Sequence, residues 1–98
     1  MTIVLREEAE EDIREAREWY QAQRSGLGDE FIAELDASLQ RLQVAPGRYP
    51  KVHGDLRRAL LRRFPYAIYF SATSNDVLVF GVLHQRRSPA VWQRRSRT

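Results

Sequence analysis

The residues with the clearest chemical potential lie between Arg57 and Arg87. Six arginines and one histidine stand at the ends of apolar runs in this stretch: Arg57, Arg58, Arg62, Arg63, His84, Arg86 and Arg87. Guanidinium groups are planar, multidentate donors that suit phosphate and carboxylate partners. We therefore interpret these seven residues as candidates for binding an anionic target.

Catalysis needs more than cationic groups. Cleavage of RNA would require a base for the 2′-hydroxyl, cations for the phosphate and an acid for the leaving oxygen. If the chain is a nuclease, His84, Arg63 and Arg86 are the candidate catalytic residues, and His53 lies in a separate segment. Because the proton-transfer groups are so few, we expect a binding protein rather than an enzyme.

Cofactor and metal motifs do not appear in the sequence. There is no cysteine, and the two histidines are far apart in the chain. No glycine-rich phosphate loop or Ser/His/Asp set is present. We expect neither a cofactor nor a metal.

The apolar runs predict a small sheet. Three β-rich runs, 57–63, 68–70 and 77–83, are separated by turn formers and predict consecutive antiparallel strands. A fourth candidate, 2–5, could lie beside the last of them, and 48–55 is interpreted as a loop. In the last strand, alternation places Leu78, Phe80, Val82, His84 and Arg86 on one side.

Two helices are predicted before the sheet. Ala9, Ile13, Ala16 and Tyr20 recur at helical spacing, and a second stripe runs from Phe31 to Leu42. The break at 25–28 is short, so the helices form an antiparallel hairpin whose apolar stripes face the sheet. The expected fold is α+β with the order β-α-α-β-β-β, the hairpin packed on one face of a small, mainly antiparallel sheet. Residues 88–92 would cover part of the other face, a partner the rest, and 93–98 would form a mobile tail.

Length and charge narrow the class of protein. Ninety-eight residues make one domain, 1–98. No apolar run is long enough for a membrane span and no signal peptide is evident, so we expect a cytoplasmic protein without membrane contact. Eleven acids and five arginines lie within 1–45, whereas eleven basic residues and two acids lie within 46–98. This asymmetry predicts one anionic and one cationic face.

Three segments in this order carry a resemblance to a known family. They are Pro46-Gly47-Arg48-Tyr49-Pro50, Arg62-Arg63-Phe64-Pro65-Tyr66 and Leu83-His84-Gln85-Arg86-Arg87. With the element order, they resemble the RelE/ParE toxin superfamily of bacterial toxin–antitoxin modules, and the ParE branch more closely. The resemblance implies a toxin that inhibits DNA gyrase by binding and is neutralised by a cognate antitoxin. Trp19, Tyr20 and Trp92 are the candidate antitoxin contacts.

Two alternatives stay open. A RelE-like protein would be a ribosome-dependent mRNA endonuclease. RelE-type toxins often place lysines or a C-terminal tyrosine near the site, whereas here the only lysine is Lys51 and no tyrosine follows Tyr69. The other alternative is an inactive toxin fold that binds nucleic acid.

Overall fold

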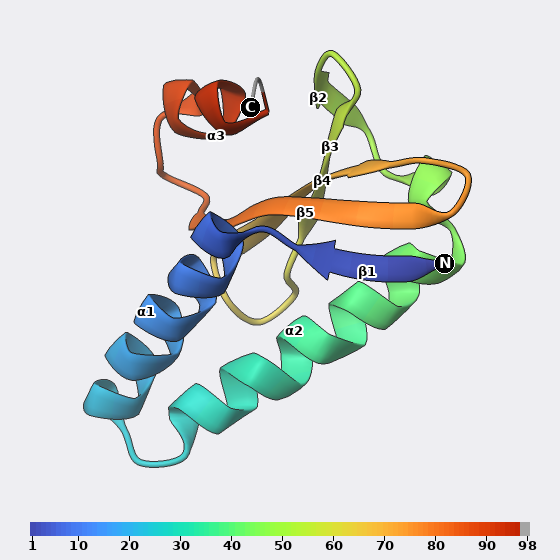
Figure 1. Cartoon of the computed structure of the whole chain (residues 1–98). Helices are drawn as coiled ribbons and strands as arrows, with labels where there is room; N and C mark the ends of the chain where they lie inside the picture. Colours follow the sequence, from blue (N-terminus) through green and yellow to red (C-terminus); the bar gives the residue numbers. More distant parts are fainter. Residues whose placement is uncertain (97–98) are drawn as a thin grey trace.

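A five-stranded sheet forms the centre of the fold (Figure 1). The computed structural model describes residues 1–96. The elements are, in chain order, β1 (Thr2–Leu5), α1 (Glu7–Gln23), α2 (Leu27–Val44), the 3-10 turn η1 (Pro46–Arg48), β2 (Lys51–His53), β3 (Leu56–Leu60), β4 (Tyr66–Ala72), β5 (Asp76–His84) and α3 (Pro89–Arg95). The strand order is β1-β5-β4-β3-β2. The β1–β5 pair is parallel and the other pairs are antiparallel, so the predicted α+β fold and the place of β1 beside β5 are confirmed.

Helices α1 and α2 lie together on one side of the sheet, which we call the helix face (Figure 1). The predicted stripes are buried there, among them Ala16, Tyr20, Phe31 and Leu42. The link between the helices is short because Gly26 adopts φ 90°, a conformation that favours glycine. Two helices too short to be stable alone are thus held by a common apolar core.

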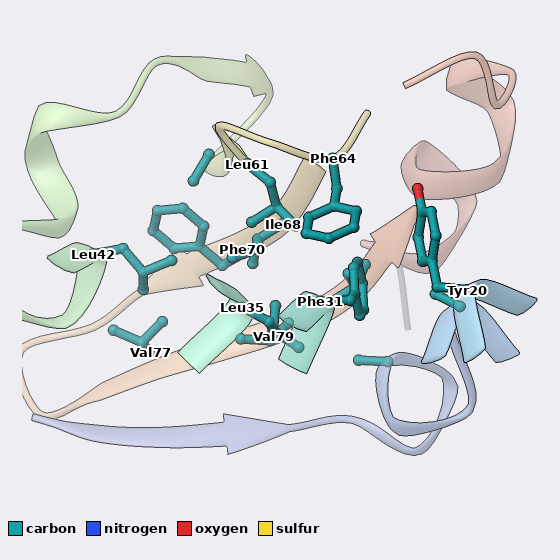
Figure 2. Close-up of a cluster of buried hydrophobic side chains, with 14 residues drawn as sticks. Tyr20, Phe31, Leu35, Leu42, Leu61, Phe64, Ile68, Phe70, Val77 and Val79 are labelled. Carbon is teal, nitrogen blue, oxygen red and sulfur yellow. The ribbon is translucent and has the colours of Figure 1, made fainter. Parts of the chain in front are cut away.

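The core of the helix face is richest in aromatic rings near the helix link. Phe31 stacks on Tyr20 with ring centroids 5.4 Å apart, and it meets Phe64 and Tyr66 edge-on, each at 5.3 Å. Figure 2 shows Tyr20, Phe31 and Phe64 grouped at one end of this core and Leu42 and Val77 at the other. Phe31 and Tyr20, which also contacts Phe64 and Tyr66, are therefore at the centre of the aromatic packing.

The opposite side of the sheet, the second face, carries a smaller core and is covered by α3 (Figure 1). Its buried residues are Leu56, Ala67, Tyr69, Phe80, Leu83 and Trp92. Trp92 of α3 stacks on Tyr69 with ring centroids 5.0 Å apart. The prediction that 88–92 covers part of this face is confirmed.

A β-bulge in β5 reverses the side on which its residues lie. Tyr69 pairs with Gly81 but Phe70 pairs with Val79, which leaves Phe80 as an extra residue. Phe80 packs on the second face, whereas Val82 packs on the helix face. The prediction that Leu78, Phe80 and Val82 share one side is therefore wrong for Val82, because simple alternation does not survive a bulge.

Three boundaries also differ from the sequence-based prediction. Within the expected loop 48–55, residues 51–53 form β2, because pairing with β3 supplies their hydrogen bonds. Strand β3 ends at Leu60 rather than Arg63, since the Leu61 N–H donates to the Tyr66 carbonyl and closes a turn. The tail does not begin at residue 93, because α3 continues to Arg95 and starts with a Ser88 cap on the Ala90 N–H. Of the expected tail, residues 97–98 lie outside the described residues.

Within residues 1–96, no helix is both long enough and apolar enough to cross a membrane.

Candidate target-binding and partner-binding site

The end of β5 and the start of β4 bring two of the sequence motifs together. Tyr66 pairs with His84, and the Gln85 N–H donates to the Pro65 carbonyl at 2.8 Å. The β3–β4 loop and the turn after β5 therefore lie side by side at one end of the sheet. The site is built on this end.

His84 is held in one orientation by its neighbours. Its ring meets Tyr66 edge-on at 5.4 Å, and its Nδ1 accepts a hydrogen bond from the Arg86 backbone N–H at 3.1 Å. An accepting Nδ1 carries no proton, so the neutral ring has its proton on Nε2. In this arrangement the lone pair is already used, and His84 offers a donor rather than a free base.

Tyr66 adds a second donor beside His84. Burial raises the pKa of the Tyr66 phenol above 10.0, and the positive charge of Arg87 offsets part of the rise. The phenol is therefore protonated at neutral pH and does not supply a base either.

A pocket of about 210 Å³ lies between α1 and this end of β5. Its lining comprises Asp12, Glu15, Ala16, Trp19, Tyr66, Val82, Leu83, His84 and Arg87. Trp19 is 58% exposed and meets Tyr20 edge-on at 5.1 Å. A large exposed aromatic ring beside hydrogen-bond donors and mixed charges is typical of a surface that binds protein. We call this the Trp19 pocket.

The seven predicted target-binding residues do not form one continuous rim. His84, Arg86 and Arg87 lie together at the end of β5. Arg57 and Arg58 are half-buried in β3, where Arg57 donates to the Tyr49 carbonyl at 2.6 Å and Arg58 hydrogen-bonds Tyr69. These two guanidinium groups stabilise the sheet around them.

Arg62 and Arg63 are adjacent in sequence, but their side chains lie in different parts of the surface. Arg63 pairs with Glu30 of α2 at 2.8 Å, and its backbone N–H donates to the Glu34 carboxylate. The hydrogen bond from Arg63, followed by one from Arg24, lowers the pKa of Glu30. Arg62 instead borders a separate hollow beside Arg41. Because Arg63 is directed towards α2, the nuclease set of His84, Arg63 and Arg86 does not converge on one point.

The three candidate antitoxin contacts differ in exposure. Tyr20 and Trp92 are buried within the chain, on the helix face and the second face respectively. Only Trp19 presents its side chain on the surface.

Sequence reasoning missed the ion pair beside the pocket. Asp12 of α1 accepts two hydrogen bonds from Arg95 of α3, at 2.5 and 3.2 Å, and a third from the Val82 N–H at 3.0 Å. Arg95 also donates to the Phe80 carbonyl at 3.4 Å. The pair thus joins α1, the bulge of β5 and α3. Gly81 inside a strand was a signal for the bulge, but nothing distinguished Asp12 from ten other acids in the first half of the chain.

Across residues 1–96, no group of three or more His, Asp or Glu side chains could hold a metal ion.

The chain has a small α+β fold, and the same architecture occurs in a solved toxin–antitoxin system. A solved structure described as the chromosomal ParDE TA system from P. aeruginosa matches with a TM-score of 0.76. The match covers 86% of this chain and 95% of that one at 14% identity, a level at which it shows the fold. A search of curated proteins finds no match.

The family follows from the sequence itself. The family model for the ParE toxin of type II toxin-antitoxin system, parDE, matches residues 3–89. The chain therefore belongs to the ParE toxin family, and the resemblance to the ParE branch is confirmed.

Proposed function

We propose that this chain is a toxin that acts by binding DNA gyrase and is neutralised by a cognate antitoxin. Both binding events take place in the cytoplasm. Membership of the ParE toxin family supports the toxin part. The observation that carries binding rather than cleavage is the use of His84 Nδ1 by the Arg86 N–H. With Tyr66 protonated as well, neither His84 nor Tyr66 supplies a base, and both present donors beside the aromatic surface of Trp19.

The Trp19 pocket is the proposed contact surface. Arg87 supplies a positive charge, His84 and Tyr66 supply donors, and Trp19 supplies apolar area. Arg86, exposed in the same turn, extends the positive surface. The target and the antitoxin share this pocket in the proposal, so that the antitoxin blocks the target by occupying it.

A supercoiling assay with purified protein tests the target. We expect the wild-type chain to inhibit gyrase. The double variant His84→Ala/Arg87→Ala should weaken inhibition at least about tenfold, because it removes two residues that anchor the interface. Arg14→Ala is the matched control, because Arg14 is an exposed arginine of α1 that pairs with Glu11 outside the pocket. Absence both of inhibition and of a trapped cleavage complex contradicts the proposal.

Induced expression in cells separates the other two functions. New 5′ ends in primer extension after induction, lost in His84→Ala, would identify an mRNA endonuclease. Normal growth after induction without a partner would identify an inactive fold.

A further change tests the antitoxin contact. Trp19→Ala should weaken binding of the co-expressed cognate antitoxin at least about tenfold, because aromatic anchors dominate interfaces. Leu60→Ala is the control, since Leu60 is 53% exposed but lies in β3, outside the pocket. Equal affinities of the two variants would exclude Trp19 as an anchor.

A further inference from the structure

A second hollow, of about 430 Å³, lies beside the C-terminal end of α2. It is lined by Arg41, Val44, Arg48, Tyr49 and Arg62, which we call the arginine patch. The three guanidinium groups come from α2, from η1 and from the β3–β4 loop. They share no residue with the Trp19 pocket.

The charges of the arginine patch are not neutralised within the described part of the chain. Among residues 1–96, no carboxylate lies within 4.0 Å of Arg41, Arg48 or Arg62, whereas Arg17 and Arg63 are paired with acids. Arg41 donates to the Ser38 hydroxyl at 2.8 Å, a contact that leaves its charge in place. Helix-dipole compensation accounts for Arg41 in the last turn of α2, but not for the convergence of three like charges from three elements.

The arginine patch also offers apolar surface in a fixed shape. Val44 is 85% exposed. Two contacts fix the position of Tyr49: its ring meets Phe70 edge-on with centroids 5.8 Å apart, and its carbonyl accepts a hydrogen bond from Arg57 at 2.6 Å. A nucleic-acid backbone would use the arginines but not the exposed valine. A polypeptide with carboxylates around an aliphatic side chain would use both.

We propose that the arginine patch is a docking site for an acidic segment of the antitoxin, separate from the Trp19 pocket. The arginines bind its carboxylates, and Val44 and Tyr49 contact an aliphatic side chain between them. The identity of the partner rests on the proposed function, whereas the ligand chemistry rests on the patch alone. Two separate contacts on one partner would raise its affinity through effective concentration.

The first experiment uses a synthetic probe, so it does not depend on toxicity. A fluorescein-labelled peptide of alternating Glu and Leu is titrated with the full chain, beside a Gln–Leu version and a single-stranded DNA oligonucleotide of the same length. We expect binding of the acidic peptide, with Kd raised at least about tenfold in R41Q/R48Q/R62Q. The matched control is R14Q/R17Q/R24Q, which removes the same charge from exposed, acid-paired arginines and should change Kd by less than about twofold.

Val44→Ser keeps every charge and should raise Kd about threefold, which tests the apolar contact independently. Equal losses in the two triple variants would overturn the proposal by showing non-specific attraction. Patch-dependent binding of the oligonucleotide in preference to the peptide would overturn it in favour of nucleic acid. Circular dichroism on each variant verifies folding, and Arg62→Gln alone, in a loop, repeats the test should the triple variant unfold.

The second experiment titrates the same variants with the cognate antitoxin. If the peptide requires the patch but the chain neither stops growth nor inhibits gyrase, the proposed function fails and the docking site stands. If the chain inhibits gyrase but the patch variants bind the antitoxin and the peptide as the wild type does, the docking site alone fails.

Discussion

The two faces of the sheet are covered in very different ways. The helix face is sealed by α1 and α2, with 17 and 18 residues, over a cluster of fourteen buried residues. Among the residues that the structure describes, the second face has a cluster of six buried residues, and the seven-residue α3 covers it. A helix of that length has no stability of its own in water, so α3 depends on its docking contacts.

Those docking contacts are few and well defined. Trp92 stacks on Tyr69, and Arg95 pairs with Asp12 at the bulge of β5. From this comparison we expect the core of the helix face to provide most of the stability of the chain, and α3 to open locally without global unfolding.

Phe31→Ala should have the largest effect. It removes the ring that contacts Tyr20, Phe64 and Tyr66 at full burial, and the expected loss in the free energy of unfolding is about 3–5 kcal/mol. Urea denaturation followed by circular dichroism measures it. A loss below about 1 kcal/mol would contradict the central role of the helix face.

Trp92→Ala tests the second face by the same measurement. The stack on Tyr69 and the burial of the indole are lost, and we expect a cost of about 2 kcal/mol. The cost is limited because the chain can release α3 and remain folded. Hydrogen exchange should show loss of protection in α3 with α1 and α2 unchanged. Uniform loss across all three helices would mean that the faces are not independent.

Asp12→Asn isolates the ion pair. The amide oxygen can still accept from the Val82 N–H, but the charge that faces Arg95 is gone. Breaking a buried pair usually costs more than 3 kcal/mol, whereas undocking of α3 returns Arg95 to water and reduces the expected cost to about 1.5 kcal/mol. Glu11→Gln is the control, because Glu11 is an exposed neighbour that pairs with Arg14 and should change stability by less than about 0.5 kcal/mol. Equal losses of stability in the two variants would show that the buried ion pair contributes no more than the exposed one.

The difference between the faces also explains what the sequence could predict. Both helices and the core of the helix face follow from periodic apolar residues such as Ile13 and Leu35, which local spacing reveals. The covering of the second face depends on contacts across the whole chain. Asp12 and Arg95 are 83 positions apart and each is one of many like residues.

The site was predictable to a similar extent. Strand ends correctly indicated that His84 and the arginines around it lie at the rim of the sheet. Spacing could not show that Arg63 pairs with Glu30 while Arg62 borders the arginine patch, because partner choice depends on how α2 crosses the sheet. Spacing also could not show the bulge at Phe80, where one extra residue moves the side chain of Val82 to the other face of the sheet.

Gly81→Ala should weaken the second face without replacing either residue of the ion pair. A Cβ at this position would lie 2.8 Å from Arg95 Nη1 and 3.3 Å from Asp12 Oδ2, so the flexible Arg95 side chain must shift. The expected loss is below about 1 kcal/mol, since only the end of a long side chain moves. Gly47→Ala is the control, because a Cβ there meets nothing within 4 Å and its φ is not positive. Equal hydrogen exchange of α3 in the two variants would contradict the steric argument.

The smallest expected effect is in the titration of Tyr69. Burial raises the pKa of Tyr69 above 10.0, with a hydrogen bond from Arg58 acting in the opposite direction. Burial also raises the pKa of Tyr20 and Tyr66 on the helix face. A raised folded-state pKa means that each phenol's contribution to stability is complete below pH 10 and is lost as pH rises through the folded value.

Releasing α3 should therefore separate the two faces in a tyrosinate absorbance titration. In Asp12→Asn, Tyr69 loses the cover of Trp92 and becomes hydrated, so its pKa falls towards 10. Tyr20 keeps its raised pKa, and the pKa of Tyr66 stays raised by burial but loses the smaller upward contribution of the Asp12 charge. Tyr69→Phe in the same background assigns the component that moves. If the titration of Asp12→Asn superimposes on that of the wild type, α3 stays docked without its ion pair, and the stack of Trp92 on Tyr69 alone is sufficient to cover the second face.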